Sequence, residues 1–145
     1  GIETLALRMD RICENTSKVA SFLQAHPKAA WVNYAGLADH PDHALVQKYM
    51  GGRASGIINF GVKSADGDGK AAGARFQDAL KLVTRLVNIG DCKSLACHPA
   101  STTHRQLSVD ELAKAGVAPD MVRLSIGIEH IDDILADLDQ ALAAV

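Results

Sequence analysis

The feature that most constrains the fold is a long run of apolar residues at helical spacing near the start of the chain. Between Ile2 and about Gln24 the apolar positions recur every three or four residues, at Leu5, Met9, Ile12, Val19, Ala20 and Leu23. This period predicts a helix with one apolar face, which must pack against a second layer. We expect the helix to end at residues 26–28, His-Pro-Lys, because proline disfavours helical backbone in the residue before it.

Short extended segments and further helices supply the second layer. Extended segments are predicted over 29–36, 56–63, 94–99 and 121–129. Further helices are predicted over 39–50, 70–90, 108–116 and 130–145. The strands are short and do not alternate strictly with the helices. We therefore expect an α/β fold, a two-layer sandwich in which helices cover a small, largely antiparallel sheet.

Local signals mark the expected ends of these helices. The second helix is expected to begin at Asp39 or Pro41. The third is expected to stop at Gly90, since glycine tolerates the left-handed backbone that closes many helices. Ser108 followed by Glu111 is a capping-box pattern, which predicts the start of the fourth helix.

Length and composition limit the class of protein. The 145 residues suit one domain with its own core, so we treat 1–145 as a single unit. The net charge of -2 supplies no basic field for nucleic acid or for anionic membranes. No apolar run has the length of a membrane span, and no signal-peptide pattern opens the chain. The chain begins with Gly1, which favours a processed or truncated polypeptide.

Cysteine usage indicates a reducing compartment. The three cysteines are an odd number and form no Cys-x-x-Cys pair: Cys13, Cys92 and Cys97. We expect buried, reduced thiols in a cytoplasmic protein rather than a disulfide framework.

Three familiar motifs fail on their spacing. The segment 66–69, Asp-Gly-Asp-Gly, lacks the glutamate of a calcium loop, and 50–56 lacks the Gly-Lys of a phosphate-binding loop. His40 and His43 lie among aspartates but have no third spaced ligand. We therefore expect no metal site.

The polar segment 88–104 is the first candidate for binding chemistry. It carries hydroxyls, imidazoles and an amide, and Asn88, Ser94, Thr103 and His104 are its candidate site residues. Binding residues tend to lie on such loops. Serine and threonine also satisfy the backbone of their own loop, and spacing assigns no nucleophile and base here, so both interpretations stay open.

Arg123 is the second candidate. It lies among small residues on one side of the strand 121–129, whose other side is apolar: Val122, Leu124, Ile126 and Ile128. A guanidinium can bind a carboxylate through two parallel hydrogen bonds. A solvated strand arginine, or one in a weak surface ion pair, remains the alternative.

Two separated segments resemble one enzyme family. "NIGDCKSLACHPASTTH" (88–104) and "VRLSIGIEHIDDILADLDQAL" (122–142) are similar to the carboxy-terminal signature of the cysteine and methionine metabolism enzymes that depend on pyridoxal phosphate. The opening 1–23 and the middle segments 32–50 and 56–63 fit the same family in order and spacing, so the resemblance covers nearly the whole chain. Within the family the chain looks most similar to O-acetylhomoserine sulfhydrylases.

The resemblance implies a fold and a substrate site. The chain would be the smaller, C-terminal domain of a fold-type I enzyme, with the cofactor-binding large domain absent. Arg123 matches the strand arginine that binds the substrate's α-carboxylate in this family, and Asn88 matches a second position that contacts it. Relatives acting on cystathionine often carry Glu-Ser where this chain has Val87 and Asn88, which favours the sulfhydrylase reaction.

The chain departs from the family pattern at the cofactor. Relatives hold pyridoxal phosphate on a lysine in a Ser-x-Thr-Lys setting, and no lysine here has that setting. The resemblance therefore implies that the missing domain binds the cofactor, that this chain alone is inactive, and that it holds no catalytic residue. It further implies an amino-acid substrate and a homotetrameric full-length protein.

Four alternatives stay open. Two of them, methionine γ-lyase and cystathionine γ-synthase, belong to the same family. The third is a stand-alone module that binds an amino acid, which would use Arg123 equally well, and the fourth is an interaction domain without a ligand.

Overall fold

The computed structural model describes residues 1–145, apart from the side chain of Val109. The helices are η1 (Ile2–Thr4), α1 (Leu5–Ala25), α2 (His43–Met50), α3 (Gly69–Ala79), η2 (Pro99–Ser101), α4 (Val109–Lys114) and α5 (Ile131–Ala143). The strands are β1 (Ala29–Asn33), β2 (Ile57–Val62), β3 (Thr84–Arg85), β4 (Leu95–Cys97) and β5 (Met121–Ser125).

The five strands form one mixed sheet in the order β1-β2-β5-β4-β3. The pairs β1–β2, β2–β5 and β4–β5 are antiparallel, and only β3 runs parallel to its neighbour β4. The expected two-layer α/β sandwich with a largely antiparallel sheet is confirmed. β5, the strand that carries Arg123, lies at the centre of the sheet.

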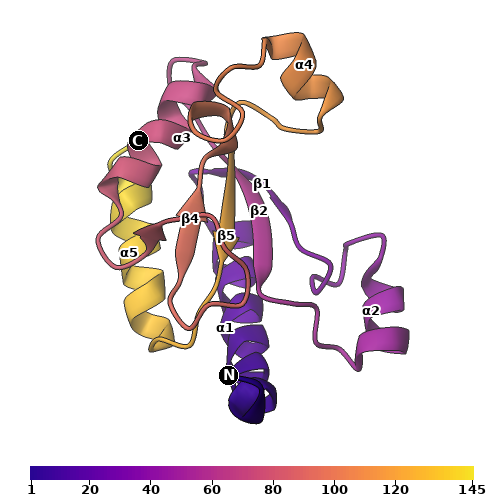
Figure 1. Ribbon diagram of the computed structural model, residues 1–145. Coiled ribbons are helices and arrows are strands. Elements are labelled where there is room, and N and C mark those ends of the chain that lie inside the picture. The colour runs from indigo at the N-terminus through magenta and orange to yellow at the C-terminus, as the bar shows by residue number, and fades with distance from the viewer.

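Helices α1, α3 and α5 cover one face of the sheet, whereas α2 and α4 project from the body (Figure 1). The core lies between these three helices and the sheet. Phe60 of β2 and Phe76 of α3 meet edge to face there, with ring centroids 5.4 Å apart. Neither side chain is exposed to solvent, so their burial stabilises the layer contact.

In the described part of the chain the opposite face of the sheet has no continuous helical layer, and only Met121 at one end of β5 packs against a small cluster that includes Ala100 of η2 and Leu112 of α4. Because side chains alternate along a strand, the buried Val122 and Leu124 place Met121, Arg123 and Ser125 on this open face. A slip of one residue in the register would expose the core side chains of β5, so the position of Arg123 is strongly specified.

The helix predicted over 70–90 is wrong beyond residue 79. The backbone turns extended at Leu80. The buried carboxylate of Asp137 on α5 then accepts the backbone N–H groups of Lys81, Leu82 and Val83, each at 2.9 Å. These N–H groups would lie in the next turn if the helix continued. Asp137, 54 to 56 residues away in the sequence, is their acceptor instead, and the chain continues into β3.

The predicted starts of two other helices have different outcomes. α2 begins at His43, after the N-cap Asp42, so the start predicted at Asp39 or Pro41 is wrong. The capping box of Ser108 and Glu111 is confirmed. No helix in the described part of the chain is long and apolar enough to cross a bilayer.

The thiols are free, but they are not all enclosed. Cys13 and Cys97 are buried as expected, whereas Cys92 is exposed, so the prediction of a buried thiol is wrong there. Cys92 lies on the exposed loop between β3 and β4, where the chain has left the sheet.

Candidate active site

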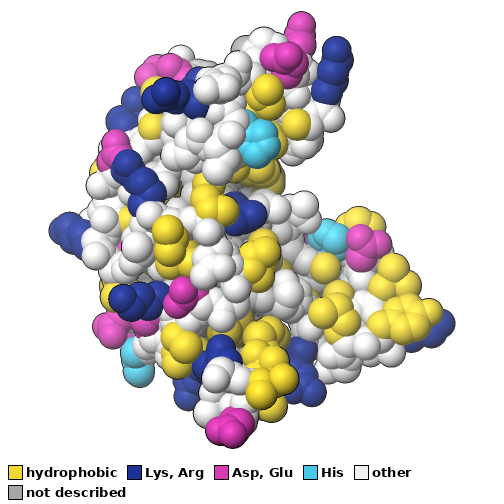
Figure 2. Space-filling view, in the orientation of Figure 1, with side chains coloured by type: hydrophobic (Ala, Val, Ile, Leu, Met, Phe, Trp, Pro, Cys, Tyr) yellow, Lys and Arg dark blue, Asp and Glu magenta, His cyan; other side chains and the backbone are white. Residues whose placement is uncertain are grey.

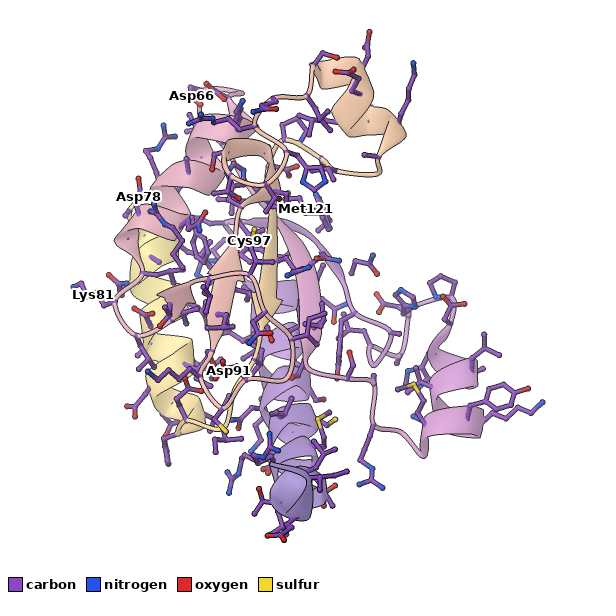
Figure 3. All side chains as sticks on the ribbon, in the orientation of Figure 1. Asp66, Asp78, Lys81, Asp91, Cys97 and Met121 are labelled. Carbon is purple, nitrogen blue, oxygen red and sulfur yellow. The ribbon has the colours of Figure 1, made fainter. Side chains whose placement is uncertain are left out.

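Arg123 occupies the middle of the open sheet face. It is half-buried, and its cross-strand neighbours are Asn59 on β2 and Cys97 on β4. Within the described residues its guanidinium forms no ion pair with a carboxylate of the chain. Figure 3 marks Cys97 and Met121, which lie at the same end of β4 and β5. The guanidinium therefore keeps its charge and its donors available for a ligand.

Asn88 lies on the exposed loop between β3 and β4. Its Nδ2 donates to the Asp91 carboxylate at 3.3 Å, and its Oδ1 accepts the N–H of Ile89 at 2.9 Å. The N–H of Lys93, and to a smaller extent Asn88, hold the pKa of Asp91 below its usual range. Asn88 thus belongs to a local turn and makes no hydrogen bond to Arg123 in the described structure.

Both ends of the loop that carries Asn88 lie next to β4 or β5, the strands that carry Cys97 and Arg123. It leaves β3 beside β4, where Val87 and Cys97 line a small pocket of about 130 Å³. It returns near the end of β5, where the N–H of Ile128 donates to the Cys92 carbonyl at 2.9 Å. In Figure 3 Asp91 lies near the lower end of β4, and Cys97 lies above it.

Ser94 is buried and anchors this loop. Its hydroxyl donates to Glu129 Oε2 at 2.9 Å and accepts the N–H of Gly127 at the same distance, and its own N–H donates to Glu129 Oε1 at 2.6 Å. A Cβ at position 127 would collide with the backbone carbonyl of Cys92, so only glycine lets the loop approach this closely. Ser94 therefore fixes the loop through its hydroxyl and its backbone N–H.

Thr103 and His104 lie at the opposite end of β4 from Ser94. The two side chains bond each other, with Thr103 Oγ1 2.8 Å from His104 Nδ1. They follow η2 near the start of β5, and no hydrogen bond joins them to Arg123 among the described side chains. The segment 88–104 therefore divides its predicted site residues between two ends of the sheet.

His98, an imidazole of the polar segment 88–104, is fully buried, with Nε2–H donating to the Pro119 carbonyl and Nδ1 accepting from Ser101, both at 2.8 Å. Its burial lowers the pKa of the imidazole. Sequence reasoning missed Asn59, which shares the open face with Arg123. The alternation of 56–63 was the available signal for Asn59, because Ile58 and Phe60 must face the core.

The residues of this chain do not fit a pyridoxal phosphate site. All eight lysines lie outside the strands, and seven of them are exposed. The half-buried Lys28 donates its Nζ to the Val145 carbonyl at 2.6 Å. A lysine that forms an imine needs a protected pocket, and none of these positions provides one. The described residues also hold no cluster of three histidine, cysteine or acidic side chains that would suit a metal.

The family model of the Cys/Met metabolism PLP-dependent enzymes matches residues 1–143. The chain belongs to this family. Members of the family depend on pyridoxal phosphate, and the resemblance stated from the two signature segments is confirmed.

Two relatives of the chain have named activities. The chain is 51% identical over 143 residues to O-acetyl-L-homoserine sulfhydrylase 1 of Thermus thermophilus, covering 99% of this chain and 33% of that protein. It is 46% identical over 145 residues to L-methionine gamma-lyase of Pseudomonas deceptionensis, covering 100% and 35%. The chain thus spans about a third of the length of these relatives.

A solved structure agrees in fold. It is a protein of Campylobacter jejuni described as an O-acetylhomoserine (thiol)-lyase, and it contains N'-pyridoxyl-lysine-5'-monophosphate. It superposes with a TM-score of 0.88 at 45% identity, covering 99% of this chain and 33% of that one. The shared fold extends over nearly all of the chain.

Proposed function

We propose that this chain is the C-terminal small domain of an O-acetyl-L-homoserine sulfhydrylase and that Arg123 binds the α-carboxylate of the substrate. The observation that carries the proposal is the half-buried guanidinium on the open sheet face, without an ion pair in the described chain. An arginine so placed offers a planar pair of donors that matches a carboxylate.

The chemical contribution of this domain is orientation. Two parallel hydrogen bonds from Arg123 fix both the position and the rotation of the carboxylate, and with it the bonds of the neighbouring α-carbon. We assign Asn88 as a second contact of the same carboxylate. Its loop begins beside Cys97, the cross-strand neighbour of Arg123, which supports that role. Thr103 and His104 would lie at the rim of the site.

The full-length protein would replace the acetate of O-acetyl-L-homoserine by sulfide to give homocysteine, a group transfer. Pyridoxal phosphate supplies the electron sink of such reactions when it is bound. The lysines of this chain do not fit it, so we assign its binding to the remaining two-thirds of the protein. Identities of 51% and 52% to named sulfhydrylases support this activity. The named methionine gamma-lyase, at 46%, makes that reaction the second candidate.

The assembly and compartment belong to the same proposal. We infer a homotetramer in the cytoplasm, acting on a small amino acid and not on nucleic acid or membranes. The three free thiols suit a reducing compartment.

Arg123→Lys in the full-length enzyme tests the carboxylate site. Lysine keeps the charge but loses the fork, so we expect KM to rise and kcat/KM to fall about 10- to 100-fold, or about 1.4 to 2.7 kcal/mol. Arg75→Lys is the matched control, because Arg75 lies on α3 on the helical side and is exposed. Steady-state kinetics with O-acetyl-L-homoserine give the comparison. Equal KM values for the two variants would remove Arg123 from the site.

A further inference from the structure

A polar row crosses the open face at the level of Arg123. The sheet register aligns Asn33 of β1 with Asn59 of β2, Asn59 with Arg123 of β5, and Arg123 with Cys97 of β4. His40 extends the row at one edge, with its Nε2 2.9 Å from Asn33 Oδ1. None of the described neighbours of Arg123 in this row is an acidic or basic residue.

Two acidic side chains near the Arg123 end of this row are engaged elsewhere. Asp120 accepts the indole N–H of Trp31 at 3.1 Å and lies against Gly61, two residues along β2 from Asn59. Glu129 is bound by Ser94 and its N–H. The titratable groups within the described row are the thiol of Cys97 and, beyond Asn33, the imidazole of His40, whose Nδ1 accepts the N–H of Asp42 at 3.1 Å. The side chain at position 59 therefore determines whether the cross-strand neighbour of Arg123 on β2 is neutral or anionic.

We propose that Asn59 is a positioning residue for Arg123 and a determinant of its affinity for an external carboxylate, an inference that rests on the proposed carboxylate site. Asn59 is half-buried and directly opposite Arg123, and directly opposed residues in antiparallel strands have Cβ atoms about 4.5–5.5 Å apart. The amide oxygen is thus within reach of a guanidinium N–H. Nothing in the described structure occupies that amide through a hydrogen bond.

The chemistry of the two side chains explains why this position carries an amide. A guanidinium has five N–H donors, and a carboxylate bound by the fork uses two of them. When a carboxylate is bound, the Asn59 amide oxygen would accept one of the others and hold the plane of the fork without neutralising its charge. A carboxylate at the same position would form an internal ion pair and compete with the substrate for the fork.

Asn59→Asp in the full-length holoenzyme tests the inference. At pH 8 we expect the KM for O-acetyl-L-homoserine to rise at least tenfold while kcat changes less than threefold. The ordinary pKa of an aspartate is about 4, so the introduced carboxyl stays ionised from pH 8 to pH 5.5 and the raised KM should persist over this range. A KM for Asn59→Asp within twofold of the wild-type value at pH 8 would overturn the proposal.

Two further variants separate charge from packing. Asn33→Asp places the same carboxylate in the same row but two strands from Arg123, about 10 Å away, and it should change KM less than twofold. Asn59→Leu keeps the branched shape, with a larger side chain, but removes the hydrogen bond and should lower kcat/KM about three- to tenfold. Equal KM values for Asn59→Asp and Asn33→Asp, or for Asn59→Asp and Asn59→Leu at pH 8, would contradict the inference.

Arg123→Lys distinguishes failure of this inference from failure of the proposed function. If Arg123→Lys raises KM and Asn59→Asp does not, the carboxylate site stands and the role of Asn59 is wrong. If neither variant changes KM, the carboxylate site itself is wrong.

Discussion

His98, the residue after β4, and Arg123 of β5 are both polar, yet they serve opposite purposes. Both ring nitrogens of His98 have protein partners, and its side chain fills a space against Gly73, where an added Cβ would collide with the ring. Arg123 has no such ion-pair partner in the described chain and only uncharged cross-strand neighbours. A satisfied, buried polar group stabilises the fold. An unsatisfied, half-buried charge is available for binding.

His98 gives the chain a pH-dependent stability. Burial lowers its pKa in the folded chain below the ordinary value of 6.5, so the unfolded chain binds the proton more tightly. Its contribution is fully present above about pH 6.5, the unfolded pKa, and is lost as pH falls toward the lower folded pKa. We expect the urea midpoint of the 145-residue chain to decrease as the pH is lowered from 7.5 to 5.5.

Two variants isolate this effect. His98→Gln keeps a donor and an acceptor but cannot take up a proton, so its urea midpoint should depend less on pH. His104→Gln, at a half-buried loop position for comparison, should retain the wild-type pH dependence. Identical pH profiles for His98→Gln and the wild type would show that another group causes the change.

At the scale of secondary structure elements, periodicity predicts a helix or strand well when the residues that end it are close in the sequence. It fails when the end is set by a residue that is distant in the sequence. The pattern in 1–24 predicted α1, and alternation in 121–129 predicted β5, because each buries one continuous face. The segment 70–90 keeps apolar residues at helical spacing through Leu82 and Leu86, and no local stop precedes Gly90. The signal that ends α3 is Asp137, which spacing along 70–90 does not reveal.

Asp137→Asn tests this tertiary stop. The carboxylate accepts three backbone N–H groups and the Gln140 side chain, so an amide NH₂ would oppose at least one donor. We expect the free energy of unfolding to fall by about 2–4 kcal/mol. Asp139→Asn, exposed on the same helix, should cost less than about 1 kcal/mol. Urea titrations of both variants by circular dichroism measure the difference, and similar losses would contradict the assigned role.

The same contrast applies to the candidate site. Arg123 was predictable because its strand is apolar on one side and the guanidinium stands out on the other. Asn59 was not singled out, because only the register between β2 and β5 places it opposite Arg123. Ser94 was selected for its hydroxyl, but its contacts with Glu129 and Gly127 depend on a loop path that composition does not encode.

At the scale of the whole molecule, apolar side chains remain exposed on the projecting parts. Figure 2 shows hydrophobic side chains gathered over α2 and a hollow between α2 and α4. Leu45, Tyr49 and Met50 of α2 are 52%, 71% and 47% exposed. Exposed apolar patches of this kind often mark contact surfaces.

The whole-molecule prediction concerns the cofactor. Because no lysine of this chain fits pyridoxal phosphate, the purified 145-residue chain mixed with equimolar cofactor should not develop the visible absorbance of a lysine-bound cofactor. It should also show no turnover of O-acetyl-L-homoserine. The full-length enzyme, under the same conditions, provides the positive control. A stoichiometric absorbance band from the chain alone would mean that one of its own lysines holds the cofactor.

The central place of β5 has a consequence for biogenesis. β2 and β4 hydrogen-bond to β5 and not to each other, although β5 is the last strand of the chain to be translated. Neither half of the sheet can close until residue 125 has emerged from the ribosome, and closing such long loops is slow. During translation the nascent chain therefore carries two unpaired strand edges, which can pair with other chains until β5 has emerged.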